Sequence, residues 1–357
     1  MNRIVYRLVY ALILSVLSVV VFSLFIAKGI SGFPPAQFHD MIYGTAFKPY
    51  VHRALLPATV RLLTAAIPRD QKKSLDRFLD ESPTIHLISA AVLFIKQQHR
   101  EALTEYAIAL LALFLSLQGF IWSLRYFFNS LYPVPRIYAD IACVAALAAL
   151  PYCFKYYSHL YDFPTLFLCT LAMGLMYNKQ WGKYLMVFVL ACLNKETAIL
   201  LVLLYAVYYR QHLHIAPYKI RLVSQVIIFL CIKTVLTVIF IHNPGSIIEI
   251  HLFDHNLRLF KLYPPVTIGI WLAIGATLAF LVFYRWPEKP RFLRDAMWMC
   301  IPLGLGILLF GFADELRVYY EVYPVIFLLA FDGLCSLSGG PLPKAENGAQ
   351  ENEIKVR

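Results

Sequence analysis

The sequence predicts an all-α, polytopic helical membrane protein, and three observations support this fold class. Among its 357 residues, 60% are hydrophobic and only 15% are charged, and the mean hydropathy is +0.65. Apolar runs recur along nearly the whole chain, a pattern typical of membrane-spanning helices. The alternation that marks β-barrel strands is absent. We therefore expect one transmembrane domain over residues 1–338, without a large soluble domain, and a disordered tail over residues 339–357.

The apolar runs predict about ten membrane segments, most of them near the ~20 residues that cross a bilayer. Their expected bounds are 4–28, 102–128, 136–154, 161–178, 182–194, 195–209, 220–241, 264–285, 295–312 and 319–337. The first run follows Arg3 and Arg7. It is too long for a signal-peptide core and lacks a clear cleavage site, so we expect it to remain as the first span.

Cysteine positions and net charge argue against a protein held by disulfides or zinc and against a nucleic-acid-binding protein. All seven cysteines lie inside or at the ends of apolar runs, so neither a disulfide framework nor a zinc knuckle is expected. The net charge of +11 comes mostly from basic residues in short loops between these runs. Because such residues orient membrane proteins, topology explains the charge better than binding to nucleic acid does.

The distribution of Lys and Arg predicts an orientation with both chain ends in the cytoplasm. The loops at 125–136, 178–183, 210–221 and 285–294 and the tail at 344–357 all carry basic residues, and all are cytoplasmic in this arrangement. An excess of Lys and Arg in cytoplasmic loops is the usual pattern of membrane proteins.

This orientation requires the fifth and sixth segments to form a hairpin whose tip, residues 194–197, lies on the outer side. The alternative, one long span over residues 184–209, would move the following basic loop to the outer side. The two arms have about 13 and 15 residues, fewer than the ~20 needed to cross. We therefore expect the tip to lie below the outer surface, in a protein-lined cavity, since lipid does not tolerate exposed irregular backbone.

The outer face then receives every conspicuous polar cluster, together with the long first loop at residues 29–101. Within that loop, residues 47–67 predict a turn and an amphipathic helix that starts near His52. After the hydrophilic stretch 69–82, residues 85–95 predict a second apolar helix. Both helices are too short to span comfortably, so we expect them to lie on the membrane surface.

Two aspartates stand in the predicted outer loops. Asp40 fits either a turn or helix-cap residue or a general base that takes a proton from an attacking hydroxyl. Asp162 follows His159 by three residues and precedes Phe163-Pro164, which is typical of a helix N-cap. The same position directs Asp162 toward the outer cavity, so a catalytic or ligand-binding role stays open.

Arg53, Lys195 and Glu196 can each be given either a structural or a functional role. Arg53 fits either an arginine that extends to the lipid headgroups or a clamp on phosphate oxygens. Lys195 and Glu196 occupy the hairpin tip, where charged residues are costly and usually functional. The alternative is a buried ion pair that joins the two arms. We favour function, with Lys195 meeting an anionic ligand and Glu196 holding a hydroxyl or the lysine.

Further polar residues lie near the last spans. Arg317 and Glu321 are four residues apart and fit an ion pair on one helix face, whereas Glu315 is expected to face the cavity. Lys233 lies in the middle of the seventh segment and should face the bundle interior or a cavity. His251 and His255 have the spacing of a metal pair, although spacing fixes no third ligand, and stacking on a sugar ring is the alternative.

Nucleotide-driven transport and serine hydrolysis have no support in the sequence. It contains no P-loop, no Gly-x-Gly-x-x-Gly after a strand, no Gly-x-Ser-x-Gly and no His-Glu-x-x-His. We predict no cofactor, and a divalent metal ion is the alternative.

The span pattern, the long first outer loop with an acidic residue and the outward polar clusters resemble the GT-C superfamily of polytopic glycosyltransferases. The stretches at 49–57, 161–164, 194–197 and 315–324 also resemble blocks of poorly characterised bacterial membrane proteins of this type. Several superfamily members carry an acidic pair in the first loop, where this chain has His39-Asp40. This departure bears directly on the base and on metal dependence.

The resemblance implies transfer of a sugar, with inversion, from a polyprenyl-phosphate donor to an envelope glycan or lipid on the outer face of a bacterial inner membrane. It implies Asp40 as the base, with Asp162 and Glu196 as further catalytic-site carboxylates that bind sugar or acceptor. The implied substrate-binding residues are Arg53, His159, Lys195, Glu315 and Arg317. Membrane lipids are the other expected partners.

Two other functions fit the same pattern. A lipid or polysaccharide transporter or flippase would use mid-span charges such as Lys233 and a broken hairpin. A non-catalytic partner in envelope polysaccharide assembly would share the architecture. The lack of an evident repeat and the gathering of polar clusters on one face favour the enzyme.

Overall fold

The computed structural model describes residues 3–81, 102–340 and 342–344. Within these ranges the secondary structure is helical, and the sole bridge between extended residues joins Ile30 and Ser158. The helices are α1 (Arg3–Ile26), α2 (Phe38–Tyr43), α3 (Leu55–Ala65), α4 (Arg69–Glu81), α6 (Leu103–Leu131), α7 (Arg136–Ala149), α8 (Asp162–Tyr177), α9 (Trp181–Asn194), α10 (Ile199–Tyr208), α11 (Ala216–Ile239), α12 (Leu259–Leu262), α13 (Pro265–Phe283), α14 (Arg291–Ala296), α15 (Cys300–Phe310) and α16 (Tyr323–Ser338). The predicted all-α class is thus confirmed for the described residues.

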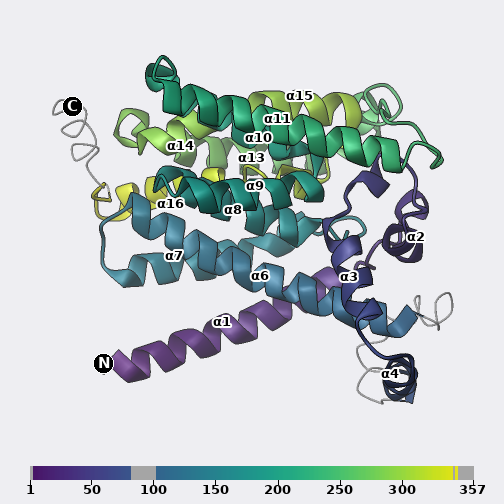
Figure 1. Cartoon of the computed structure of the whole chain (residues 1–357). Helices are drawn as coiled ribbons and strands as arrows, with labels where there is room; N and C mark the ends of the chain where they lie inside the picture. Colours follow the sequence, from purple (N-terminus) through teal and green to yellow (C-terminus); the bar gives the residue numbers. More distant parts are fainter. Residues whose placement is uncertain (1–2, 82–101, 341, 345–357) are drawn as a thin grey trace.

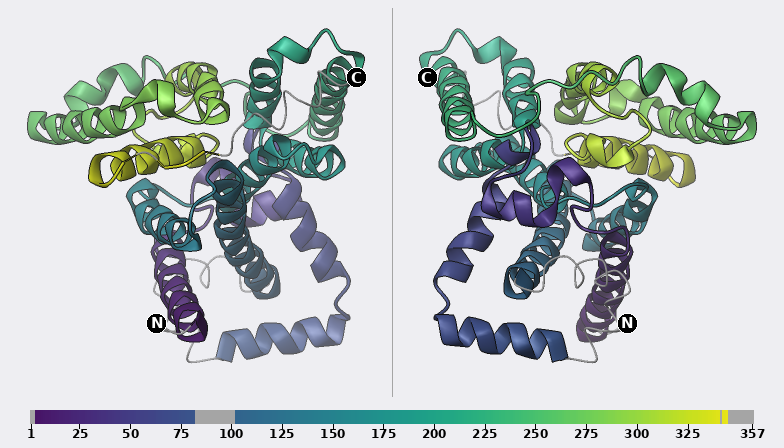
Figure 2. Two further views of the ribbon diagram at one scale, coloured as in Figure 1. Left: turned by 90° about the vertical axis from the view of Figure 1, so that its left-hand side faces the viewer. Right: turned by 90° about the vertical axis from the view of Figure 1, so that its right-hand side faces the viewer.

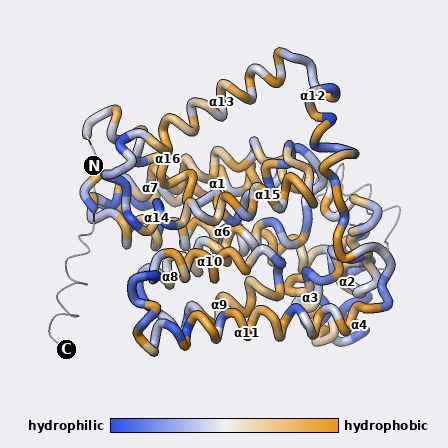
Figure 3. Tube along the Cα trace, turned by 90° about the horizontal axis from the view of Figure 1, so that it is seen from above, coloured by the Kyte–Doolittle hydropathy of each residue, from blue (hydrophilic) through white to orange (hydrophobic). Residues whose placement is uncertain are grey.

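Six helical stretches in the described ranges are long and apolar enough to cross a membrane. They are Ile4–Ile26, Leu103–Leu131, Arg136–Cys153, Ala216–Ile239, Pro265–Phe283 and Arg291–Phe310. The other four predicted segments correspond to shorter apolar helices, Asp162–Tyr177, Trp181–Asn194, Glu196–Tyr208 and Tyr323–Ser338. Figure 3 shows the apolar character running along the helices, with hydrophilic residues gathered near their ends. These helices indicate a multi-pass membrane protein.

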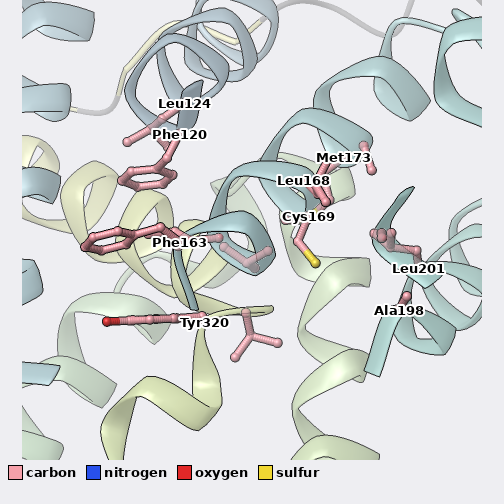
Figure 4. Packing of buried hydrophobic residues seen from close by; sticks show 14 of the residues in the cluster. Phe120, Leu124, Phe163, Leu168, Cys169, Met173, Ala198, Leu201 and Tyr320 are labelled. Atoms are coloured by element: carbon pink, nitrogen blue, oxygen red, sulfur yellow. The ribbon is translucent and has the colours of Figure 1, made fainter. Parts of the chain in front are cut away.

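The buried helix α8 organises the core. It packs against α6 on one side and α9 on another, and its apolar residues are almost all buried. Figure 4 shows Phe163 near Phe120 of α6, whereas Cys169 and Met173 lie toward Leu201 of α10. Such a helix is apolar all round because protein rather than lipid surrounds it.

A close crossing joins α13 to α16. A Cβ atom at Gly333 would lie 2.1 Å from the carbonyl oxygen of Leu281, so this position of α16 has no room for a side chain. Small residues at such crossings let helix backbones approach closely in membrane proteins. Elsewhere α13 is largely exposed, as expected for a helix that faces lipid.

The chain breaks at the predicted hairpin tip. Helix α9 ends at Asn194, Lys195 is extended, and a 3-10 turn over Glu196–Ala198 leads into α10. The Asn194 amide donates to the carbonyl oxygen of Tyr161 over 3.1 Å and to Oγ1 of Thr165 over 2.8 Å. These bonds tie the tip to α8, and the alternative of one long span over residues 184–209 is wrong.

The first loop is more structured than the sequence predicted. Helix α3 begins at Leu55, close to the expected start, and packs on α6 with Leu56 and Val60 buried. The hydrophilic stretch after it forms α4, which lies across the direction of α1 and α6 (Figure 2). Lys72 of α4 pairs with Glu105 at 2.6 Å and holds α4 to the start of α6. The predicted helix at 85–95 and the tail beyond residue 344 lie outside the described residues.

Candidate active site

One cavity of 410 Å³ lies where several helices begin or end, and it draws its walls from distant parts of the chain. Its lining residues are Phe33, Tyr50, Arg53, Tyr156, Tyr157, His159, Tyr161, Asp162, Lys195, His251, His255, Phe310, Gly311, Phe312, Glu315, Arg317 and Val318. These residues lie in the segments that follow α1, α9, α11 and α15 and in the segments that precede α3, α8 and α16. Helices α1, α9 and α15 therefore end at the level where α8 and α16 begin, in keeping with helices that run back and forth (Figure 1).

Arg317 links two carboxylates on the cavity wall. Its Nη1 lies 3.1 Å from Oδ2 of Asp162, and its Nε donates to Oε1 of Glu315 over 2.8 Å. A second bond, from Nη2, goes to the same Oε1, and among the described residues no group donates to Oε2 of Glu315. The expected pair between Arg317 and Glu321 is therefore wrong, and Glu315 lines the cavity.

Asp162 connects the loop before α8 to Arg317 and does not cap the helix. It is the first residue of α8, and its Oδ2 accepts a 2.8 Å hydrogen bond from the backbone N–H of His159, which precedes the helix. No side-chain bond caps the first turn of α8. The N-cap interpretation is wrong, because the carboxylate turns back toward the loop and meets Arg317 there.

Arg53 closes another side of the cavity. Its Nη2 lies 2.6 Å from Oε1 of Glu196, and its guanidinium carbon lies 4.2 Å from the ring centre of Tyr161. Burial would lower the pKa of Arg53, but the adjacent Glu196 outweighs this effect and raises it. The guanidinium thus stays charged, and the geometry is that of a stacked, carboxylate-paired arginine.

Lys195 pairs with Glu321 and not with its sequence neighbour Glu196. Its Nζ lies 2.7 Å from Oε1 of Glu321, a carboxylate that is fully buried and also accepts a hydrogen bond from Thr197. Consecutive residues at the hairpin tip therefore point to separate partners, Lys195 to the start of α16 and Glu196 to Arg53. A mutual pair of Lys195 and Glu196 joining the two arms is not formed.

His159 and Glu315 bring two perturbed groups to the same cavity. Burial lowers the pKa of His159 far below its usual value, and the nearby Arg317 and Arg53 lower it further. Its ring stacks on Tyr161 at 5.0 Å, and its Nδ1 is buried with no hydrogen-bond partner among the described residues. Burial raises the pKa of Glu315, although Arg317 opposes the shift. The cavity therefore holds a neutral imidazole and a carboxyl that ionises less readily than usual.

Asp314 forms the adjoining network, which the sequence did not assign. It accepts hydrogen bonds from Tyr156 and Tyr263, both over 2.6 Å, and meets Nε2 of His255 at 2.8 Å and the ammonium of Lys155. Burial would raise the pKa of Asp314, but these hydrogen bonds outweigh it and hold the pKa well below the usual range. A fixed carboxylate thus ties the loop before α13 to the loop before α8.

His251 and His255 contact different carboxylates. His255 meets Asp314, whereas His251 lies 3.1 Å from Asp254 and packs on Phe312. Within the described residues, no group of three or more His, Cys, Asp and Glu side chains is arranged to hold a metal ion.

The structure brings together most of the predicted site residues. Those that line the cavity are Arg53, His159, Asp162, Lys195, Glu315 and Arg317. Glu196 adjoins it through Arg53. Asp40 is the exception, because it lies in α2, is half-exposed, accepts a 2.8 Å bond from Oγ1 of Thr45 and does not line the cavity.

Several members of the site were not predicted from the sequence as site residues. They include the aromatic lining residues Tyr50, Tyr156 and Tyr161 and the partner carboxylates Glu321 and Asp314. Their positions at the ends of apolar runs could have indicated them, because Tyr161 is adjacent to Asp162 and Asp314 is adjacent to Glu315. Comparison of the chain with protein-family models, curated proteins and solved structures gives no match.

Proposed function

We propose that this protein is an integral membrane glycosyltransferase of GT-C type, with ten membrane segments, that moves a sugar from a polyprenyl-phosphate donor to a glycan or lipid acceptor. The observation that carries the proposal is the composition of the cavity. Arg53, Lys195 and Arg317 share it with carboxylates and with an aromatic wall, in a bundle of apolar helices. A lipid-linked sugar phosphate presents the matching chemistry: an anion, a polar ring and an apolar tail.

The three cations would hold the donor phosphate. Guanidinium forks suit phosphate oxygens, and a positive charge placed at the leaving phosphate stabilises the charge that develops there. Each cation is now held by a carboxylate, so phosphate would join or displace an existing pair. Tyr50 and Tyr161 offer ring faces on which a sugar can stack, as expected for amphipathic aromatic side chains in binding sites.

Glu315 is the best-placed base. Its Oε2 receives no bond within the described structure, and its pKa is raised by burial, toward the range in which a carboxylate accepts protons efficiently. In the proposed step, Glu315 takes the acceptor hydroxyl proton as that oxygen bonds to the anomeric carbon. The bond from this carbon to the phosphate oxygen breaks, and the electron pair leaves with the phosphate. This assignment replaces Asp40, the base implied by the resemblance.

Transfer of a labelled sugar from polyprenyl phosphate in proteoliposomes tests the proposal. We expect Glu315→Gln to lower the rate ~10²–10⁴-fold, as for loss of a positioned base. Glu81→Gln is the matched control, because Glu81 is exposed and does not line the cavity. Activity in Glu315→Gln together with its loss in Asp40→Asn would return the base to Asp40. Absence of product with a panel of donors, alongside movement of labelled lipid across the vesicles, would identify a flippase instead.

A further inference from the structure

Two further hollows lie along α6, and neither shares a lining residue with the candidate active site. One, of 510 Å³, lies between α1, α6 and the start of α7, and its polar lining comes from Arg125, Asn129 and Arg136. The other, of 420 Å³, lies between α6 and α8, where Phe167 contributes to its wall. Trp122 lines both hollows, as does Tyr126, so the two adjoin along one face of α6.

The larger hollow is basic. It has two arginines in its lining and no acidic residue. Arg125 pairs with Asp140 at 2.7 Å, but Asp140 lies outside the lining and also accepts a 2.6 Å bond from Tyr6. The Nε of Arg125 is buried without a hydrogen-bond partner among the described residues. Across that same part of the chain, no carboxylate lies within ion-pair distance of Arg136.

The smaller hollow is apolar. Its walls include Phe167 and Leu171, and the Ser123 hydroxyl there is satisfied by a 2.7 Å bond to the carbonyl oxygen of Gly119. Trp122, at the junction, is 74% exposed. A basic hollow, an exposed tryptophan and an apolar hollow thus follow one another along α6.

We propose that these hollows form a binding site for an anionic phospholipid, separate from the glycosyl-transfer cavity. The phosphate lies against Arg136 and the exposed part of the Arg125 guanidinium, and an acyl chain covers Trp122 and the apolar hollow. Basic pockets between membrane helices bind anionic headgroups in this way. A free phosphate would satisfy the arginines but would leave the adjoining apolar hollow unused, so the continuity of the two hollows favours a lipid.

Quenching of tryptophan fluorescence by brominated lipids tests the site. The full-length protein is reconstituted with brominated phosphatidylglycerol or with phosphatidylcholine of the same brominated chains. We expect stronger quenching by phosphatidylglycerol at low mole fraction, and we expect this difference to disappear in Trp122→Phe. Equal quenching by the two lipids in the wild-type protein would overturn the proposal.

Charge variants and a soluble competitor complete the test. Arg136→Gln should weaken the preference for phosphatidylglycerol about fivefold, since one basic residue near the membrane surface contributes roughly that much. Lys219→Gln is the matched control, because Lys219 is exposed and lies outside both hollows. Arg136 has no ion partner within the described structure, so its loss should leave folding intact. If glycerol phosphate displaced the lipid at equal concentration, the site would be an anion site only and the lipid assignment would fail.

Discussion

At the scale of single residues, each cation of the candidate active site is held by a carboxylate from a distant part of the chain. Arg53 meets Glu196, Lys195 meets Glu321, and Arg317 meets Asp162. Buried pairs of this kind stabilise a fold weakly, because desolvation offsets much of the attraction. In the proposed reaction, the donor phosphate would exchange with these pairs.

The sequence identified the charged residues of the site but not their partners. Arg317 and Glu321 satisfy helical spacing, yet Arg317 lies in a 3-10 turn before α16 and turns toward α8. Spacing along one element was therefore a poor guide to pairing across elements. Asp40 was assigned from its loop alone, and nothing local to it reports which way α2 faces.

Removal of Arg317 should destabilise the protein strongly. In Arg317→Gln, both Asp162 and Glu315 lose their cation while buried, and breaking a buried pair typically costs ~3–5 kcal/mol. Thermal unfolding in detergent measures the loss. Adding Glu315→Gln to Arg317→Gln should restore part of it, because one uncompensated charge disappears. Equal unfolding temperatures for the wild-type and Arg317→Gln proteins would contradict this description of the site.

The pKa of Glu315 predicts the acid limb of the transfer rate. Only the ionised carboxylate accepts a proton, so activity should fall as the pH decreases through the pKa of Glu315. Burial raises this pKa above the usual glutamate value, so the fall should occur at a higher pH than for an exposed glutamate. A pH profile of transfer in proteoliposomes measures it. Residual activity in Glu315→Gln should lack this limb, and its persistence there would assign the limb to another group.

At the scale of elements, the helices were predictable because their signals are local. Each of the ten predicted segments contains a helix, since uninterrupted apolar residues leave the backbone no better way to satisfy its hydrogen bonds. The hairpin tip was predictable from its polar tetrapeptide. Helix α4 was missed because it is hydrophilic, although Leu75, Phe78 and Leu79 follow helical spacing within it. Its contacts with α6 arise from pairs such as Lys72 and Glu105, which local patterns do not report.

The crossing of α13 and α16 yields a test at this scale. Gly333→Val should separate the two helices, because its Cβ would collide with the carbonyl oxygen of Leu281. Overpacking of this kind typically costs ~1–3 kcal/mol. Gly275→Val in α13 is the control, since its Cβ would meet no atom within 4 Å. Thermal unfolding of both variants in detergent should show a loss for Gly333→Val alone, and a similar loss in both would indicate a general effect of valine.

At the scale of the whole molecule, the back-and-forth course of the helices places the candidate active site at one end of the bundle and the basic hollow at the other. The lining of the first cavity comes from loops that the charge pattern assigns to the outer side. The second hollow includes Arg125 and Arg136, which the same pattern assigns to the cytoplasm. The predicted orientation would therefore place the proposed sugar transfer on the outer side and the proposed lipid site on the cytoplasmic side.

Labelling of single cysteines tests this orientation. In a background without Cys231, Cys300 and Cys335, the cysteines that are not buried, His242→Cys should react with a membrane-impermeant thiol reagent added to intact cells, and Gln211→Cys should react only after the membrane is opened. Both positions are exposed, and they flank α11 at its two ends, so accessibility within the protein does not decide the result. Both should react in detergent, which controls for reactivity. Reversed labelling would put the cavity on the cytoplasmic side, where the proposed outer-face transfer could not occur, whereas labelling of both sites from outside would mean that α11 does not cross the membrane.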